Sequence, residues 1–371
     1  MLPLAVPPPQ PVTGQWTGQL SGETPALGVL ELEQHDTTIV ATAFMYPHDA
    51  EIVPAAVRFE FQPPLSVHQL NGLPVLPFSP DLGAIISRQE MTALFPNSDV
   101  SDTANVSLKF MGDTVEVSFE TAMVTGFGTL TKGHTQPSRL QSIPMSWDKF
   151  KADSTTWDQG RFVYRGQAAP WRLRTSFHRT WRKNLDTYTS TLIRELHKGL
   201  TPRLSKSLDF TNPEDVGAFY SVAQHHGYPT PLLDWSRSPF VAAFFAFEHA
   251  SPNTAVRIIA FDKAAWTRLT QERVVSLARP HVSFVDLLPY DNDRAMPQKS
   301  EFTLTNIDDI ENHIMALEYA RQTRFLFAID IPASERTRVL ADLALMGIDH
   351  ASLFPGMEGI CKAMRYKHFG C

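Results

Sequence analysis

The sequence predicts an α+β protein in which an all-β domain, either a sandwich or a barrel, precedes a mixed α+β domain. Short runs of β-branched and aromatic residues, separated by Gly, Pro, Asp and His, dominate about the first 140 residues. Patterns of helical spacing become frequent only after residue 145, and strand patterns are interspersed with them in no regular order. The length of 371 residues allows two or three domains.

The composition is that of a globular protein and excludes several functional classes. A net charge of −6 gives no general attraction to nucleic acid or to an anionic membrane. Cys361 and Cys371 are too few for a disulfide framework or a cysteine zinc site, and we expect no metal. No apolar run reaches about 18 residues, and the start lacks the basic and apolar regions of a signal peptide. We therefore expect a cytoplasmic protein without a membrane partner.

The N-terminal part is predicted to be a flexible lead-in followed by a β-rich accessory domain. Residues 1–12 hold five prolines, which favours an extended lead-in, and the β-rich domain is expected over 13–138. Its clearest feature is a hairpin, because two alternating runs, Asn105–Met111 and Thr114–Glu120, are separated by Gly112-Asp113. Further expected elements are strands at Ala26–Leu32, Thr37–Met45 and Ala56–Phe61 and a short helix at Ala84–Phe95. The domain shows no catalytic spacing, so we expect it to bind a partner or a regulator.

The second domain is predicted over residues 145–371 and contains helices and strands in mixed order. Helices are expected at Ser146–Trp157, Asn184–Leu200, Lys263–Gln271, Asp308–Met315 and Pro332–Met346, with a loop and helix at Ala351–Met364. Strands are expected at Phe162–Tyr164, Ala255–Phe261, His281–Leu288, Phe302–Thr305 and Arg324–Ile331.

The segment Gln224–Ser236 is central, because it gathers polar residues between two further predicted helices. The first helix, Pro213–His226, has Asn212 or Thr211 as its cap and acidic residues in its first turn. The second begins at Pro239 after a serine cap and is apolar on every side, which is typical of a buried helix. One glycine and two prolines restrict the path between them. We therefore expect a stiff polar loop against a buried helix, which is one way to build a binding site.

Two charged residues suit ligand binding. Arg165 follows a strand and precedes Gly166, so a planar cation stands where the backbone lets a phosphate or a carboxylate approach closely. Asp234 lies beside Trp235, and its carboxylate is suited to orient a base or to hold a ribose hydroxyl. Structural alternatives stay open: Arg165 pairs with a buried acid such as Asp234, or Asp234 caps the turn before the buried helix.

Adjacent histidines and a polar cluster before a late strand are further candidates. His225 and His226 point in different directions on a helix, so we expect one to pack and one to form a hydrogen bond, without metal. Gln298 and Glu301 stand at the mouth of a strand, where they are suited to hold a sugar hydroxyl as positive charge develops at the anomeric carbon. The alternative for Glu301 is a solvated strand edge.

A run of cations next to tryptophans suggests a different class of function. The residues are Arg172, Arg174, Arg179, Arg182 and Lys183, with Trp171 and Trp181. Cations combined with stacking surfaces are typical of nucleic-acid-binding proteins, and the alternative is a solvated charged face.

The segments singled out above resemble the FRG domain, a bacterial and phage-associated family named for an aromatic-Arg-Gly motif. The motif is present as Tyr164-Arg165-Gly166-Gln167, and the long segment Gln224–Ser236 with Ser238-Pro239 is the most specific part. The stretches Asn292–Thr303 and Gly347–Gly359 also fit. The resemblance spans about residues 145 to 371 and leaves out the β-rich domain.

The family layout is similar to that of ADP-ribosyltransferases, which implies NAD as a co-substrate. The residues that would bind it on this likeness are Tyr164, Arg165, Gly166, Gln167, Asp234, Trp235 and Ser236. Arg165 would hold the pyrophosphate or ribose, and His226 would contact the ligand or transfer a proton. Gln298, with Glu301 nearby, would take the place of the transferases' key glutamate, although a glutamine cannot act as a general base.

The leading hypothesis is NAD-dependent ADP-ribosyl transfer or NAD hydrolysis, as in a toxin or a phage-defence effector, with an unknown protein or nucleic acid as acceptor. One alternative is nucleic-acid binding or processing, which predicts steep salt dependence. Another is a non-catalytic interaction module in which the motifs only fix the fold.

Overall fold

The chain forms two compact units. The computed structural model describes residues 12–79, 84–133, 137–180, 182–270, 280–287, 290 and 292–369. The first unit, called the barrel unit, comprises Met1–Gly133, Phe177–Ile193 and Ser276–Pro280. The second, called the mixed unit, comprises His134–Ser176, Arg194–Val275 and His281–Cys371. The predicted lead-in at 1–12 lies outside the described residues except for Val12. Among the described helices, none has the length and apolar character needed to span a membrane.

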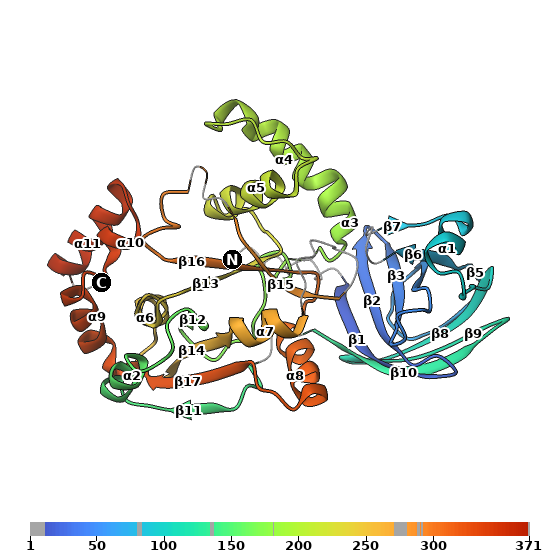
Figure 1. Cartoon of the computed structure of the whole chain (residues 1–371), viewed down its shortest axis with the longest axis horizontal. Coiled ribbons are helices and arrows are strands. Elements are labelled where there is room, and N and C mark those ends of the chain that lie inside the picture. The colour runs from blue at the N-terminus through green and yellow to red at the C-terminus, as the bar shows by residue number, and fades with distance from the viewer. Residues whose placement is uncertain are drawn as a thin grey trace, which may run out of the picture. The chain divides into compact units, whose positions relative to one another are not determined.

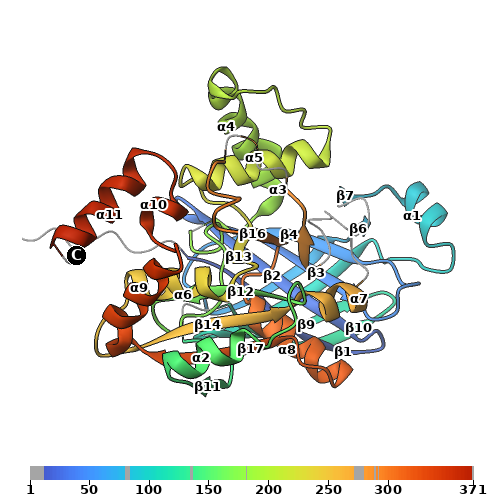
Figure 2. The ribbon, with the colours of Figure 1, turned by 60° about the vertical axis from the view of Figure 1, so that its left-hand side comes forward.

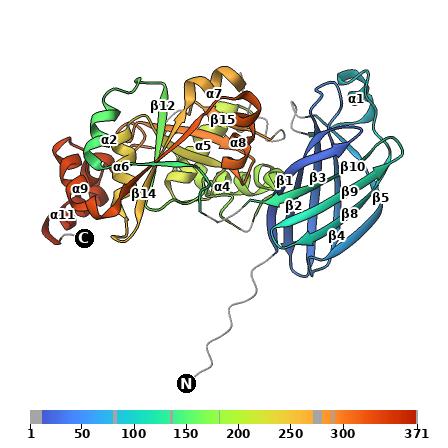
Figure 3. The same cartoon turned by 90° about the horizontal axis from the view of Figure 1, so that it is seen from below.

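The barrel unit is built from one antiparallel ten-stranded sheet that curls into a nearly closed barrel (Figure 3). The strand order is β5-β8-β9-β10-β1-β2-β3-β4-β6-β7. The bounds are β1 Thr13–Gly22, β2 Ala26–His35, β3 Thr38–Pro47, β4 Ala55–Phe61, β5 Val67–Pro74, β6 Leu76–Ser79, β7 Ala84–Ile85, β8 Thr103–Met111, β9 Thr114–Thr121 and β10 Thr125–Lys132. The rings of Phe61 on β4 and His68 on β5 lie 4.3 Å apart between centroids, so the two sides of the sheet meet.

Local sequence explains most of this sheet. The predicted hairpin is confirmed as β8 and β9, with Met111 opposite Thr114 and Gly112 in the left-handed turn conformation that glycine favours. The predicted helix over Ala84–Phe95 is shorter, because it begins only after Ser87, whose side chain caps α1 (Arg88–Leu94). Trp16 of β1 is fully buried in the core.

The segment Phe177–Ile193 adds to the barrel unit through the outer face of β2. Glu33 accepts hydrogen bonds from the main-chain amides of Lys183 and Asn184. The segment contains α3 (Leu185–Thr187), which is capped by Asn184. A short π-helix, η1 (Tyr188–Leu192), follows and continues into α4 (Ile193–Leu200). The mixed unit is therefore not continuous in sequence, and the predicted boundary of an FRG domain at 145–371 stays a prediction.

The mixed unit is a seven-stranded sheet with helices on both faces (Figure 1). The strand order is β11-β17-β14-β12-β13-β16-β15, and all neighbours are antiparallel except β11 and β17. The strands are β11 Ser142–Pro144, β12 Phe162–Gln167, β13 Leu232–Ser236, β14 Ala255–Asp262, β15 Val282–Val285, β16 Ser300–Thr305 and β17 Leu326–Pro332. The helices are α2 Trp147–Ser154, η2 Thr201–Arg203, α5 Pro213–His225, α6 Pro239–Glu248, α7 Lys263–Thr270, α8 Ile310–Arg321, η3 Ala333–Glu335, α9 Arg336–Leu345, α10 His350–Leu353 and α11 Met357–Phe369.

Each face of this sheet has its own core. On one face, side chains of α2, α6, α9 and α10 pack on β12, β14 and β17, with Trp147 and Phe247 fully buried (Figure 2). On the other face, α7 and α8 pack on the same strands and on β13, around Trp266 and Phe261. The two apolar cores fix the sheet between helical layers, which confirms the mixed α+β class.

The centre of the predicted polar loop is a strand, which corrects the expectation of a loop. The helices on either side are confirmed: Asn212 caps α5 and Ser238 caps α6. Between them, Leu232–Ser236 forms β13, inserted between β12 and β16. Every residue of β13 except Asp234 is buried, and burial of its apolar side chains stabilises an extended strand despite the preceding prolines.

Candidate functional site

Arg165 lies on β12, the middle strand of the mixed sheet, between one buried neighbour and one tightly packed neighbour. Tyr164 is buried, its ring stacks on Trp157 with centroids 5.7 Å apart, and burial raises the pKa of its hydroxyl to about 12. A Cβ atom on Gly166 would lie 1.8 Å from the carbonyl oxygen of Ala242 in α6. The packing of helix against strand therefore requires glycine at this position, whether or not a ligand binds.

A chain of hydrogen bonds connects Arg165 with the end of α5. Arg165 Nη1 donates to the main-chain oxygen of Asp234 at 2.8 Å and lies 3.9 Å from its carboxylate. The Gln224 side chain of α5 donates to the other carboxylate oxygen of Asp234 and accepts a hydrogen bond from Thr230. The main-chain amide of Thr230 donates to Ser176 Oγ at 2.9 Å. Four separate segments thus position one carboxylate.

Asp234 is the exposed member of this network. Its side chain is 57% exposed, whereas that of Arg165 is 20% exposed. Asp234 lies in β13, and the N-cap of α6 is Ser238, so the alternative in which Asp234 caps the turn before that helix stays a prediction. The pairing of Arg165 with Asp234, one of the structural alternatives, is confirmed by the contacts, although the acid is exposed rather than buried.

The neighbours of Asp234 on β13 have structural roles in the cores. Trp235 is buried and its indole N–H donates to Thr303 Oγ1 at 3.0 Å. Ser236 is buried, donates to the main-chain oxygen of Gln298 at 2.7 Å and accepts from the amide of Ser238. Both side chains form or support the fold around Asp234, and their predicted contact with NAD stays a prediction.

Gln298 and Glu301 lie on opposite faces of the sheet. Gln298 precedes β16, and its side-chain amide donates to the main-chain oxygen of Leu353 in α10 at 3.0 Å. Glu301 is in register with Trp235 and pairs with Lys263 at the start of α7 at 2.7 Å. Since α10 and α7 cover different faces, the side chains of Gln298 and Glu301 contact different layers of the unit.

The last residue of the Arg-Gly motif is also buried. Gln167 is 8% exposed, and its side-chain oxygen has no hydrogen-bond partner within the described part of the chain. Its register partner on β14 is Arg257, which forms a bidentate pair with Asp330 at 2.8 Å.

The prediction for the two adjacent histidines holds in part: one forms a hydrogen bond, but the other is exposed rather than packed, and their rings lie 4.9 Å apart. His225 Nδ1 lies 3.0 Å from the side-chain oxygen of Asn292, and His226 is exposed at the C-terminus of α5. Burial lowers the pKa of His225, and the charges of Arg294 and His226 lower it further. Within the described ranges, no group of three or more His, Cys, Asp or Glu side chains is placed to hold a metal ion.

Three of the five cations in the predicted run are buried, so the run as a whole is not an exposed charged face. Arg174 forms a bidentate pair with Asp308, and Arg172 lies 3.0 Å from Asp309, with all four side chains almost fully buried. Lys183 is buried and donates to main-chain oxygens. Arg179 and Trp171 are exposed, Arg182 is half-buried, and Trp181 lies outside the described residues.

Three acidic residues at the start of α8 were not singled out from the sequence, because their partners lie more than 130 residues away. Besides Asp308 and Asp309, Glu311 accepts hydrogen bonds from the main-chain amides of Leu173 and Arg139. Burial raises the pKa of Asp309 and of Glu311. These bonds anchor the segment after β12 on α8.

Comparison with known proteins identifies one relationship. Residues 160–255 match the model of the FRG domain. The match contains Arg165, Gln224 and Asp234, whereas Gln298 and Glu301 lie beyond it. Searches among curated proteins and solved structures find no match.

Proposed function

Because the chain contains an FRG domain at residues 160–255, we propose that this domain binds NAD and breaks the bond between its nicotinamide and ribose. The products would be nicotinamide and either ADP-ribose linked to an acceptor or free ADP-ribose. The single observation that carries the proposal is the half-exposed Asp234 carboxylate, held from two sides by Arg165 and Gln224. A role as a toxin or phage-defence effector and a cytoplasmic location stay predictions.

The carboxylate has the chemistry that this bond cleavage needs. When the glycosidic bond breaks, its electron pair leaves with nicotinamide and positive charge develops on the ribose. A fixed carboxylate stabilises that charge or accepts a hydrogen bond from a ribose hydroxyl. Water or an acceptor then attacks the anomeric carbon and loses a proton. Asp234 fits this role because its position is set by main-chain and side-chain bonds before any ligand arrives.

The remaining candidates take supporting roles in this proposal. The Arg165 guanidinium offers positive charge for the diphosphate, within the limits of its 20% exposure. Gln298 lies on the Asp234 face and is suited to orient a ribose, while the exposed His226 at the end of α5 is suited to contact the ligand. Glu301 is held in an ion pair on the other face, so the carboxylate chemistry falls to Asp234.

The test compares two carboxylates of equal exposure. Full-length protein is mixed with NAD, binding is measured by calorimetry, and nicotinamide release is followed by chromatography, with and without cell extract. Asp234→Asn should lower the release rate by roughly 100-fold or more, because a preorganised electrostatic group is lost. Asp148→Asn is the matched control, since Asp148 is 59% exposed and also lies beside an arginine, Arg338. It should leave the rate unchanged.

Two outcomes would contradict the proposal. The first is a wild-type protein that neither binds NAD nor releases nicotinamide under any of these conditions. The second is an equal rate in the Asp234 and Asp148 variants, which would mean that Asp234 takes no part in the reaction.

A non-catalytic interaction module is the second candidate, and the bond from Arg165 to a main-chain oxygen favours it. Because that bond also supports the fold, Arg165→Ala should lower stability under either function and does not separate them. Asp234→Asn does, since a polar exchange at an exposed side chain leaves a structural module intact. The nucleic-acid alternative loses its basis, because Arg172, Arg174 and Lys183 are buried.

A further inference from the structure

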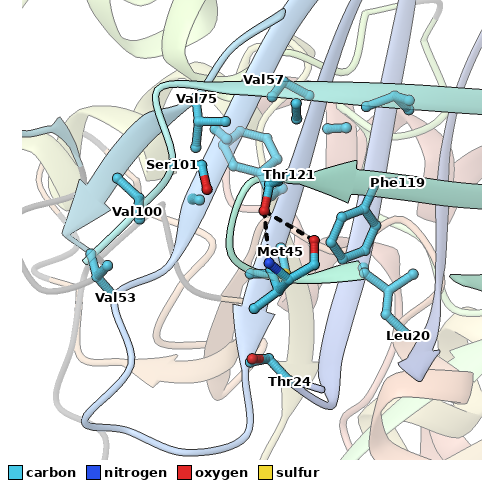
Figure 4. A pocket seen from close by; sticks show the side chains of 18 of the residues that line it. Leu20, Thr24, Met45, Val53, Val57, Val75, Val100, Ser101, Phe119 and Thr121 are labelled. Atoms are coloured by element: carbon cyan, nitrogen blue, oxygen red, sulfur yellow. Dashed lines mark hydrogen bonds between the residues drawn. The ribbon is translucent and has the colours of Figure 1, made fainter. Parts of the chain in front are cut away.

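The barrel unit contains an internal cavity of about 300 Å³ (Figure 4). Residues of β1 to β4 and of β8 to β10 line it, together with the loop before β4 and the loop before β8. Protein interiors are normally packed as densely as organic crystals, with few voids larger than a water molecule. A space of this size inside a barrel is therefore a feature that needs an explanation.

Small residues at lining positions create the space. Gly28, Ala43, Ala56 and Ala104 lie on four different strands of the barrel and all line the cavity. Barrels of about this size either fill their interior with side chains or hold one small ligand there. Larger side chains at Gly28, Ala43 and Ala104 would take up this space, so the sequence keeps it open, whereas Ala56 is in register with Phe44 on the other face of the sheet.

The rest of the lining is mostly apolar. The larger side chains include Leu20, Val57, Phe119 and Leu130. An apolar cavity holds water poorly, because each water needs two to four polar partners. The lining therefore favours an apolar occupant over a cluster of waters.

Polar residues also line the cavity, and one of their side-chain atoms is buried without a partner within the described residues. Ser101 lines the cavity, and its hydroxyl oxygen is buried without a hydrogen-bond partner in the part of the chain that the structure describes. Thr121 and Ser98, which also line the cavity, both have partners: Thr121 Oγ1 donates to the main-chain oxygen of Val124, and Ser98 Oγ accepts from the amide of Val53. Leaving a hydroxyl buried and unbonded is unfavourable, so Ser101 points to a partner that a ligand supplies.

The cavity reaches the surface. Met123 and Asp99 are among its lining residues, and 56% of Met123 and 62% of the Asp99 side chain are exposed. Both belong to the loops at one end of the barrel. A ligand can enter between these loops without unfolding the strands.

We propose that the barrel unit binds a small, mostly apolar molecule that carries one hydrogen-bonding group, and that this group bonds to the Ser101 hydroxyl. An apolar cavity of about 150 Å³ accepts benzene, so twice that volume suits a molecule of roughly 10 to 20 non-hydrogen atoms. This site is independent of the function proposed for the FRG domain, since all its lining residues belong to the barrel unit.

The test uses two probes of the same shape that differ in one group. 1-Naphthol carries a hydroxyl where 1-methylnaphthalene carries a methyl group. Each is titrated into full-length protein whose methionine methyl groups are labelled with carbon-13, and binding is followed by NMR. Met45 and Met123 line the cavity, so their signals should shift saturably with both probes. Met111, which lies outside the lining on β8, should not shift.

Two variants locate the binding and its polar contact. Ser101→Ala should weaken 1-naphthol binding by roughly threefold to tenfold, the effect of one hydrogen bond, and leave 1-methylnaphthalene unchanged. Ala43→Phe fills the cavity and should abolish binding of both probes. Val67→Phe is its control, because Val67 is exposed on β5 and does not line the cavity.

The proposal is overturned if neither probe gives a saturable shift at Met45 or Met123 up to its solubility limit. It is also overturned if both probes bind the Ala43→Phe protein as tightly as the wild type. Equal effects of Ser101→Ala on the two probes would overturn the assignment of the hydrogen bond. Because the wild-type titration reports the position of binding directly, a variant that fails to fold does not prevent the decision.

Discussion

The barrel unit and the mixed unit differ in how they use their interiors. The barrel keeps about 300 Å³ open by placing small residues such as Gly28 and Ala104 on the inside. The mixed unit brings a helix so close to its central strand that Gly166 has no room for a methyl group. The interior of the barrel unit is suited to bind a small molecule. The close packing in the mixed unit is suited to keep side chains at its surface in fixed positions.

The two units also differ in where they place their ion pairs. Both units carry exposed ion pairs, but the mixed unit also buries Arg174 with Asp308 and Arg172 with Asp309. Buried charges interact more strongly than exposed ones, and they destabilise a protein when a partner is lost. On the two proposals made above, function in the barrel would depend on the space left by small residues. In the mixed unit it would depend on groups, such as Asp234, that a hydrogen-bond network positions.

The largest effect should come from breaking a buried pair. Arg174→Ala leaves the Asp308 carboxylate buried and uncompensated, so the free energy of unfolding of the mixed unit should fall by roughly 3 to 5 kcal/mol. Urea unfolding followed by tryptophan fluorescence measures the change. A double variant, Arg174→Met with Asp308→Leu, should recover much of the loss. A single-variant loss below about 1 kcal/mol would contradict the importance of burial.

The contrast between interiors can be tested with the same substitution in each unit. Gly166→Ala places a methyl group against the backbone of α6, which cannot yield, so we expect a loss of about 3 kcal/mol. Gly28→Ala meets only the side chains of Leu20 and Leu130, which can rotate into the cavity, so we expect less than about 1 kcal/mol. Thermal unfolding of both variants gives the comparison. Equal losses of stability would mean that the barrel interior around Gly28 is packed as tightly as the mixed unit around Gly166.

The two units should also respond to pH in opposite directions. Burial lowers the pKa of His281 and of His313 in the mixed unit to about 4, from 6.5. The folded unit keeps them neutral while the unfolded chain protonates them, so stability falls as pH drops from about 6.5 towards 4. Burial raises the pKa of Glu31 in the barrel from 4.5 to about 7. Its stabilising contribution is full below about pH 4.5 and is lost as pH rises towards 7.

Between pH 7 and pH 5, each of these groups should change the free energy of unfolding by about 2 kcal/mol. The barrel should gain stability while the mixed unit loses it. Hydrogen exchange read by mass spectrometry follows peptides of each unit separately. Glu31→Gln should remove the gain in stability of the barrel unit between pH 7 and pH 5 and leave the loss of stability in the mixed unit unchanged. A parallel response of both units to acid would refute the assignment of these pKa shifts.

The sequence predicted elements whose local patterns are strong. Runs of β-branched and aromatic residues identified β2 and β3, alternation identified the β8 to β9 hairpin, and capping residues identified α5 and α6. Seven of the described strands were not predicted: β1, β5, β6, β7, β10, β11 and β13. Glycines weaken the strand pattern in β1 and β10, and two prolines and an aspartate obscure β13.

The sequence predicted only those parts of the candidate site that depend on local sequence motifs. Asp234 and Arg165 were recognised from their neighbours in the sequence. The positions of Gln298 and Glu301 on opposite faces depend on the sheet order, which local patterns do not contain. The burial of Arg174 was hidden because Asp308 lies 134 residues further along the chain.

The smallest expected effect concerns exposed ion pairs, one in each unit. Arg88 in the barrel pairs with Asp99 and Asp102, and Arg338 in the mixed unit pairs with Asp148. Because these side chains are well exposed, Arg88→Ala and Arg338→Ala should each lower the free energy of unfolding by less than about 1 kcal/mol. Equal small losses would show that burial, rather than the unit in which a pair lies, sets its contribution.

Arg88→Ala should nevertheless change ligand exchange in the barrel. Arg88 also donates to the main-chain oxygen of Val100 at 2.9 Å, so its bonds hold the loop in which Asp99, Val100 and Ser101 line the cavity. Without these bonds the loop opens more often, and 1-naphthol should both bind and dissociate faster, with its Kd changed less than either rate. NMR line shapes at Met123 measure the exchange rate, and Arg338→Ala is the control. An unchanged rate in the Arg88 variant would mean that the ligand enters by another path.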